Sequence, residues 1–200
     1  MKLLLISDLE QQQYWEPRPE DFRGVDLILS AGDLKPEYLN RLARAGLSAP
    51  GRSYLLYVYG NHDQRCPQYL SRDCVCVDGD LLTVKGLRIL GLGGSLRYKH
   101  GPYQYTEEEM QRRIEDLERK LRKSGGADIV LTHAPPRGLG DRDDPVHRGF
   151  ACFRTLLETW KPAYLVHGHI HLHENEEAGR IRQYRETTLI NACGSFMLEL

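Results

Sequence analysis

The sequence predicts an α/β sandwich, and the arrangement of its apolar runs is the main reason. Six runs are apolar along most of their length, at residues 2–6, 25–30, 53–59, 87–92, 127–132 and 163–167. Strands without a polar face are typical of sheets that are covered on both sides. Helical segments alternate with several of these runs, which indicates strand–helix–strand units. The carboxyl ends of such strands are where a site is expected.

The remaining elements are predicted from shorter patterns. Alternation of apolar and polar residues favours antiparallel strands at residues 74–77, 81–84, 180–184, 187–192 and 195–200. The clearest helix spans 107–123, where Thr106 and Glu109 form a capping box and apolar residues recur on one face. Two more helices are predicted, from Pro36 to Gly46 and from about Gly149 to Trp160.

Length and composition favour a single cytoplasmic domain over residues 1–200. The 27 basic and 28 acidic residues leave a net charge of −1, so no general basic field attracts nucleic acid. The first apolar run is too short for a membrane span or a signal peptide. The five cysteines form no CxxC pair, which is typical of reduced thiols in the cytoplasm. Nothing in the sequence indicates an oligomeric state.

Polar groups that bind metals follow five of the apolar runs. They are Asp8 with Glu10, Asp33, Asn61-His62-Asp63, His133, and His169-Ile170-His171. A single aspartate after a strand is more often a turn or a helix cap than a ligand. Five such groups at strand ends on one side of a sheet are difficult to explain by capping alone. Imidazoles, carboxylates and an amide oxygen together suit a divalent metal ion.

The ordered motifs resemble those of the calcineurin-like metallophosphoesterase superfamily, whose pattern is D-x-H, G-D, G-N-H-[DE], H and G-H-x-H. Here they read Asp8-x-Glu10, Gly32-Asp33, Gly60-Asn61-His62-Asp63, His133 and Gly168-His169-x-His171. The resemblance covers nearly the whole chain, and GNHD and GHxH in this order are its most specific parts. It implies a four-layer α/β/β/α sandwich of two mixed sheets with a two-metal centre at the strand ends.

The resemblance also implies a role for each of these residues. Asp8 and His171 would bind the first metal, and Asp33 would bridge to the second. Asn61, His133 and His169 would complete the second metal site, and His62 would protonate the leaving oxygen or stabilise charge on the phosphoryl group. Two divalent ions can together hold the attacking and leaving oxygens of an in-line displacement.

Glu10 departs from the family pattern, which has histidine at this position. In one interpretation, which we favour, Glu10 is a ligand of the first metal; in the other it points away and that site is weak or empty. As a ligand, Glu10 would bring the charge of two ions, three carboxylates and a bridging hydroxide to zero. A neutral centre attracts a phosphate dianion less. We therefore expect hard ions such as Mn²⁺, with Fe, Zn, Ni, Co or Mg as alternatives, and better relative activity on diesters than on monoesters.

Two irregular segments are candidates for substrate contact. Arg97 lies in the segment 93–105, and Arg137 and His147 lie in the segment 134–148. Long loops inside compact domains are often functional, and an arginine can bind a phosphate in a bidentate manner. The alternative is that these are solvated loops. His167 and His173 lie outside the motifs, and we interpret them as structural and surface residues.

The leading functional prediction is a metal-dependent phosphoesterase that hydrolyses a phosphodiester or phosphomonoester by attack of a metal-bridging hydroxide. A small, possibly nucleotide-like phosphorylated substrate is expected. The alternative is a non-catalytic scaffold or interaction protein of the same fold. Six of the seven expected ligand positions carry the family residue and the seventh is still a carboxylate, which favours the enzyme.

Overall fold

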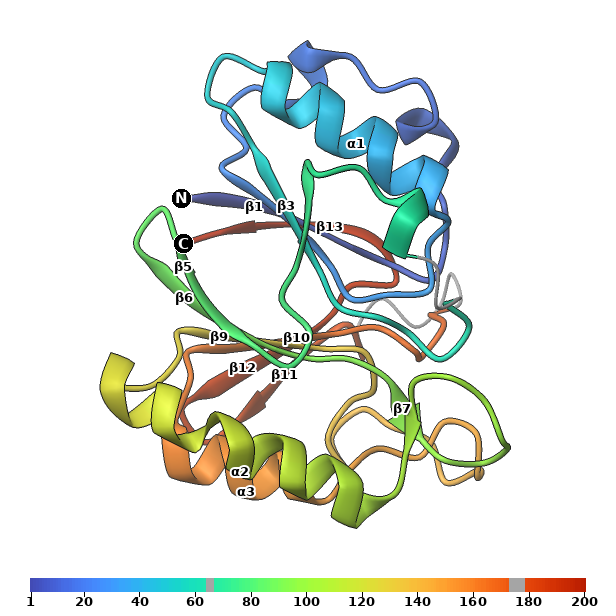
Figure 1. The fold of residues 1–200 in the computed structure, drawn as a ribbon, viewed down its shortest axis with the longest axis vertical. Coiled ribbons are helices and arrows are strands. Elements are labelled where there is room, and N and C mark those ends of the chain that lie inside the picture. Colours follow the sequence, from blue (N-terminus) through green and yellow to red (C-terminus); the bar gives the residue numbers. More distant parts are fainter. Residues whose placement is uncertain (64–66, 173–178) are drawn as a thin grey trace.

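A computed structural model describes residues 1–63, 67–172 and 179–200. Two large sheets face one another, with helices on the two outer surfaces (Figure 1). This architecture confirms the prediction of an α/β/β/α sandwich.

The first sheet has the strand order β13-β1-β2-β3-β4. Its strands are β1 (Lys2–Ser7), β2 (Leu27–Ser30), β3 (Tyr54–Tyr57), β4 (Cys74–Cys76) and β13 (Gly194–Glu199). Strands β1 to β4 run parallel, and β13 pairs antiparallel with β1. The prediction of an antiparallel strand at 74–77 is therefore wrong. Alternating burial marks an edge strand with one exposed face, but it carries no information about strand direction.

The second sheet has the strand order β11-β12-β10-β9-β6-β5. Its strands are β5 (Leu81–Val84), β6 (Leu87–Leu92), β9 (Ile129–Thr132), β10 (Tyr164–His167), β11 (Ile181–Tyr184) and β12 (Thr187–Asn191). The central strands are parallel and the two edge strands are antiparallel, so this sheet is also mixed. Two short strands, β7 (Ser95–Leu96) and β8 (Gln104–Tyr105), pair with each other in the segment that the sequence predicts as loop.

Helix α1 (Pro36–Ser48) covers the first sheet, and α2 (Glu107–Ser124) and α3 (Cys152–Trp160) cover the second (Figure 1). Short 3-10 helices η1 (Gln12–Tyr14), η2 (Pro19–Phe22) and η3 (Pro67–Tyr69) lie in the connections. The capping box of α2 is confirmed, because Glu109 N–H donates to Thr106 Oγ1 and Thr106 N–H donates to Glu109 Oε2. Helix α3 begins at Cys152, later than predicted, because Phe150 pairs with Pro136 in a β-bridge.

Three layers of apolar side chains hold the sandwich together. One lies under α1, one lies between the sheets, and one lies under α2 and α3. The middle layer joins residues of both sheets, including Leu5 and Leu29 from the first and Leu131 and Val166 from the second. This packing fixes the carboxyl ends of β1, β2, β3, β9 and β10, which carry the predicted metal ligands. None of the helices that the structure describes is long and apolar enough to cross a membrane.

Candidate metal centre

Carboxylate and imidazole groups from both sheets converge at the strand ends. One ligand atom each from Asp8, Asp33 and His133 lie within 4.8 Å of one another. Asp8 follows β1, Asp33 follows β2, and His133 follows β9 of the other sheet. The Asp8 side chain is 1% exposed and that of His133 is fully buried. Buried carboxylates this close repel one another, so the arrangement needs a positive charge between them.

His133 presents one ring nitrogen to this centre. Its Nδ1–H donates to the carbonyl oxygen of Ala31 at 2.7 Å, which leaves Nε2 facing inward. Nε2 lies 2.9 Å from Asn61 Oδ1 and 3.3 Å from Asp33 Oδ2. Burial of the ring opposes protonation, but the negative charge of Asp33 outweighs it and raises the pKa of His133 to about 9. The proton on Nε2 lies between the ring and the oxygens of Asn61 and Asp33. A metal ion in its place would bind the same nitrogen and oxygens, so these residues fit a divalent cation.

Asp33 is fixed by its neighbours as well as by charge. The backbone N–H of His62 donates to its Oδ1 at 2.8 Å. Burial of Asp33 opposes ionisation, but the charge of His133 and its hydrogen bond outweigh this and lower the pKa of Asp33 to about 2. The carboxylate is therefore ionised at every pH at which the protein would be assayed.

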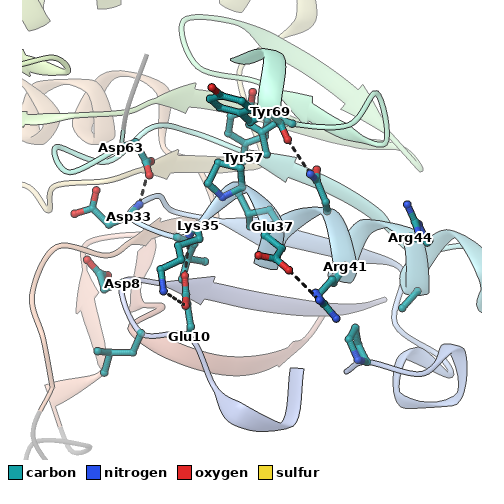
Figure 2. Close-up of a pocket in the computed structure, with 18 of the residues that line it drawn as sticks. Asp8, Glu10, Asp33, Lys35, Glu37, Arg41, Arg44, Tyr57, Asp63 and Tyr69 are labelled. Atoms are coloured by element: carbon teal, nitrogen blue, oxygen red, sulfur yellow. Dashed lines mark hydrogen bonds and ion pairs between the residues drawn. The ribbon is translucent and has the colours of Figure 1, made fainter. Parts of the chain in front are cut away.

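Asp63 supports the site in a way that the sequence analysis did not anticipate. Its Oδ2 accepts hydrogen bonds from Gly60 N–H at 2.7 Å and from Asp33 N–H at 3.1 Å. The side chain therefore ties the turn after β3 to the turn after β2, as Figure 2 shows. The sequence signal that could have revealed this role is the position of Asp63 at the end of the GNHD motif, because that motif is specific to the family pattern.

Three of the expected ligands have left-handed backbone conformations. The φ angles are 60° at Asp8, 57° at Asp33 and 67° at His169. Such angles are unfavourable for residues other than glycine, at a cost of order 1–3 kcal/mol each, and they cluster at functional sites. Five other described residues have such angles elsewhere in the chain, so the angle does not mark a ligand by itself; at these three positions it sets the direction in which the side chain leaves the strand end.

The histidines after β10 close the other side of the centre. The His169 backbone N–H donates to both carboxylate oxygens of Asp8, at 3.1 and 3.0 Å. Its ring lies 4.9 Å from that of His133, and its Nε2–H donates to the Val146 carbonyl at 2.8 Å, so Nδ1 carries the lone pair. Burial lowers the pKa of His169 to about 3, so the ring is neutral as a ligand must be. His171 Nε2 lies 3.9 Å from Asp8 Oδ1.

Comparison with known families decides which family the chain belongs to. The profile of the calcineurin-like phosphoesterase superfamily domain matches residues 1–197. The chain belongs to the calcineurin-like phosphoesterase superfamily. Membership confirms the resemblance seen in the motifs and indicates a metal-dependent phosphoesterase at the level of the superfamily. Among curated proteins, no sequence matches this phosphoesterase significantly.

Solved structures share the fold at low sequence identity. TT1561 of Thermus thermophilus matches with a TM-score of 0.66 and 16% identity, over 96% of this chain and 89% of that one. GAP50, the anchor in the inner membrane complex of Plasmodium, matches with a TM-score of 0.54 and 12% identity, over 96% of this chain and 70% of that one. A putative 5'-nucleotidase from Staphylococcus aureus in complex with alpha-ketoglutarate matches with a TM-score of 0.52 and 14% identity, over 99% of this chain and 50% of that one. These likenesses show the fold of the phosphoesterase.

Glu10 lies apart from the ligand cluster of the phosphoesterase. Its Oε1 accepts a hydrogen bond from Lys35 N–H at 2.9 Å, and its Oε2 pairs with Lys35 Nζ at 3.2 Å. In Figure 2 the two side chains point toward each other, to the right of Asp8 and below Asp33. In the described part of the chain, the cluster of possible ligand atoms contains Asp8, Asp33 and His133 but not Glu10.

A cavity of about 1700 Å³ opens beside the centre and continues along α1 (Figure 2). Asp8, Asp33 and His62 line it at the end next to the centre. Its far part is lined by residues of α1 and by the segments on either side of that helix, among them Pro17, Arg41, Arg44 and Tyr69. The exposed ring of His62 therefore faces the space that a substrate would occupy.

The three predicted substrate-binding residues do not line this cavity. Arg97 Nη2 donates to Glu109 at 2.6 Å, at the first turn of α2. Arg137 is exposed, and its backbone N–H donates to the Phe150 carbonyl. His147 pairs with Asp144, and its ring lies 5.5 Å from that of His169, beside the metal centre. His167 is buried, as expected of a structural residue, and His173 lies outside the described residues.

Tyr98 links the segment between β7 and β8 to the metal centre. Asn61 Nδ2–H donates to its hydroxyl at 3.2 Å, which orients Asn61 Oδ1 toward His133. We expect Tyr98→Phe to weaken metal affinity about tenfold, because outer partners of metal ligands typically contribute 10–100-fold. Mn²⁺ titration of the purified variant measures this change. Tyr54→Phe, an exposed tyrosine of β3, is the control, and equal affinities in the two variants would contradict the role of Tyr98.

Proposed function

We propose that this protein hydrolyses a phosphodiester, in preference to a phosphomonoester, at a centre of two divalent metal ions. The convergence of Asp8, Asp33 and His133 beside the cavity, which Asp8 and Asp33 line, is the observation that carries this proposal. The ions would polarise the phosphoryl group and lower the pKa of an attacking water. The carboxylate and amide oxygens support the choice of Mn²⁺, and the imidazoles also suit Zn²⁺, Fe²⁺ or Ni²⁺.

We assign the residues to the two ions as the family motifs imply. Asp33 lies between the groups and would bridge the ions. Asn61, His133 and His169 would hold the second ion, and Asp8 and His171 would hold the first. His62 is exposed at the cavity, and we assign it the transfer of a proton to the leaving oxygen. Its position is supported by its backbone N–H, which donates to Asp33 and fixes the turn that carries the ring.

The preference for a diester is supported by the charges beside the centre. Lys35 pairs with Glu10, and this ion pair cancels one positive charge that would otherwise attract a phosphate dianion. A diester carries one negative charge on the reacting group and a monoester carries two. Glu10 therefore disfavours the monoester whether it binds Lys35 or a metal ion.

The lining of the cavity supports a substrate with an organic group beside the phosphate. The groove along α1 combines apolar residues with the guanidinium groups of Arg41 and Arg44 and the exposed ring of Tyr69. Tyrosine rings stack on bases and arginines bind phosphates, so a nucleotide-like group fits this lining. The name of the staphylococcal neighbour, a putative 5'-nucleotidase, is consistent with this class of substrate.

The test compares hydrolysis of bis-p-nitrophenyl phosphate and p-nitrophenyl phosphate with Mn²⁺, Zn²⁺, Ni²⁺ or Mg²⁺ added. We expect metal-dependent turnover, with kcat/KM at least about tenfold higher for the diester, and the highest rate with Mn²⁺. Glu10→His removes a negative charge and should raise the monoester-to-diester ratio of kcat/KM. A lower ratio in this variant would contradict the charge argument. Absence of both metal and turnover under every ion would instead favour a non-catalytic scaffold.

We also infer that residues 1–200 act as one domain, because both sheets contribute ligands to the same centre. A cytoplasmic location is supported by the cysteines, since no disulfide joins those within the described residues.

A further inference from the structure

The ion pair between Glu10 and Lys35 uses both oxygens of the carboxylate. Oε1 accepts from the backbone N–H of Lys35, and Oε2 pairs with its Nζ. The Glu10 side chain is 16% exposed, whereas that of Lys35 is 71% exposed. The carboxylate is therefore held against the protein, and its partner ammonium reaches it from the solvent side.

The N-terminus of helix α1 also stabilises the position of the Glu10 carboxylate. Lys35 is the N-cap residue of this helix, so Glu10 accepts from one of the N–H groups at the positive end of the helix dipole. The Lys35 ammonium also lies 5.6 Å from the ring of Trp15, which favours its present position. Three separate interactions thus stabilise the orientation of Glu10 toward α1.

This orientation removes a ligand from one side of the metal centre only. Glu10 occupies the position two residues after Asp8 that a metal-binding histidine takes in the family motif. Without it, the side of the centre that includes Asp8 and His171 keeps fewer donors, and the His171 side chain is 56% exposed. The opposite side keeps Asn61, His133 and His169, which are all buried.

We propose that Lys35 withholds Glu10 from the metal centre, so that the protein binds one divalent ion tightly and the second only weakly. This inference rests on the two-ion function proposed above. Activity would then depend on the concentration of free metal, because the second ion loads only when that concentration is high. Lys35 would be the positioning residue that sets the concentration of free metal at which the second ion binds.

The experiment measures Mn²⁺ binding to the whole protein, without any substrate. Free Mn²⁺ is followed by its electron paramagnetic resonance signal, and isothermal titration calorimetry provides the stoichiometry. For the unmodified protein we expect two classes of site whose Kd values differ by at least about tenfold, since outer partners of ligands change metal affinity by 10–100-fold. Two equal sites would overturn the proposal.

A double-mutant cycle separates the action of Lys35 through Glu10 from a general effect of its charge. Lys35→Met should tighten the weak site about tenfold, because the Glu10 carboxylate is then able to turn toward the ion. The same substitution should have little effect in a Glu10→Gln background. An equal effect in both backgrounds would show that only charge matters and would overturn the proposal.

Two further variants complete the design. Arg44→Met removes another cation that lines the same cavity, and it should leave the weak site unchanged. Glu10→His supplies the family ligand and should tighten the weak site even with Lys35 present. Circular dichroism melting of each variant confirms that it is folded. If the folded protein bound no Mn²⁺ at all, the proposed function would fail together with this inference.

Discussion

Replacing Asp33 by asparagine is expected to reduce kcat/KM by more than 100-fold and to lower the metal content of the purified protein. Loss of an outer partner of a ligand costs about 10–100-fold, and Asp33 is placed as a ligand that touches both sides of the centre. The variant keeps the size of the side chain but removes the negative charge that holds His133 protonated. Metal analysis and the rate of diester hydrolysis measure the two effects.

A matched control is available at Asp128. This carboxylate accepts three hydrogen bonds from Arg88, near the start of β6, and it does not line the cavity. Asp128→Asn should lower the melting temperature while leaving kcat/KM and metal content within about twofold of the unmodified protein. If both variants lost activity equally, the effect at Asp33 would reflect general destabilisation and not the metal centre.

Alanine at Gly60 or Gly168 is expected to disrupt the centre without altering any ligand. A Cβ atom at Gly60 would overlap the carboxylate of Asp33, and one at Gly168 would lie 2.5 Å from Asp8 Oδ2. The ligand would have to turn away or the backbone would have to shift, and overpacking of this kind typically costs 1–3 kcal/mol. We expect loss of metal binding and a melting temperature lower by about 5–10 °C.

Gly51→Ala is the matched control for the glycine variants. A Cβ atom there would have no neighbour closer than 4.0 Å, and Gly51 does not have a positive φ. This variant should retain metal binding and full thermal stability. Retention of metal by both Gly60→Ala and Gly168→Ala would mean that Asp8 and Asp33 are not held as closely as the structure places them.

The two glycines are required for a reason other than the one that usually explains glycine in a turn. Glycine in these motifs favours a tight turn, because it adopts backbone conformations that other residues avoid. Neither Gly60 nor Gly168 has a positive φ, whereas Asp8, Asp33 and His169 do. The glycines provide space for the carboxylates, and the ligands themselves carry the strained backbone.

Local patterns were sufficient for most elements and for the order of the ligand-bearing turns. Helix α2 follows from a capping box and an apolar face, which depend on residues three or four positions apart. Within each sheet the groups could be predicted to converge, because parallel strands bring their carboxyl ends to the same edge, whereas the meeting of the two sets depends on how the sheets pack. That argument needs only the identity of the strands and of the residue that follows each one.

The sequence alone could not predict the partners that side chains choose across the fold. Glu10 and Lys35 are 25 residues apart, and they meet because α1 begins beside the turn after β1. Arg97 meets Glu109 for the same kind of reason, since β7 and the first turn of α2 lie together. A carboxylate or guanidinium can satisfy several partners, and which one is nearest depends on how the elements pack.

The sequence by itself therefore determined the sandwich, the superfamily and the turns that carry Asp8, Asp33 and His133, because these depend on short-range patterns and on strand order. Only the tertiary structure decided that Glu10 binds Lys35, that Asp63 ties two turns together and that three ligands adopt left-handed backbone conformations. These features arise where groups distant in the chain are buried together. There the cost of an unpaired charge or an unsatisfied N–H selects one arrangement among several.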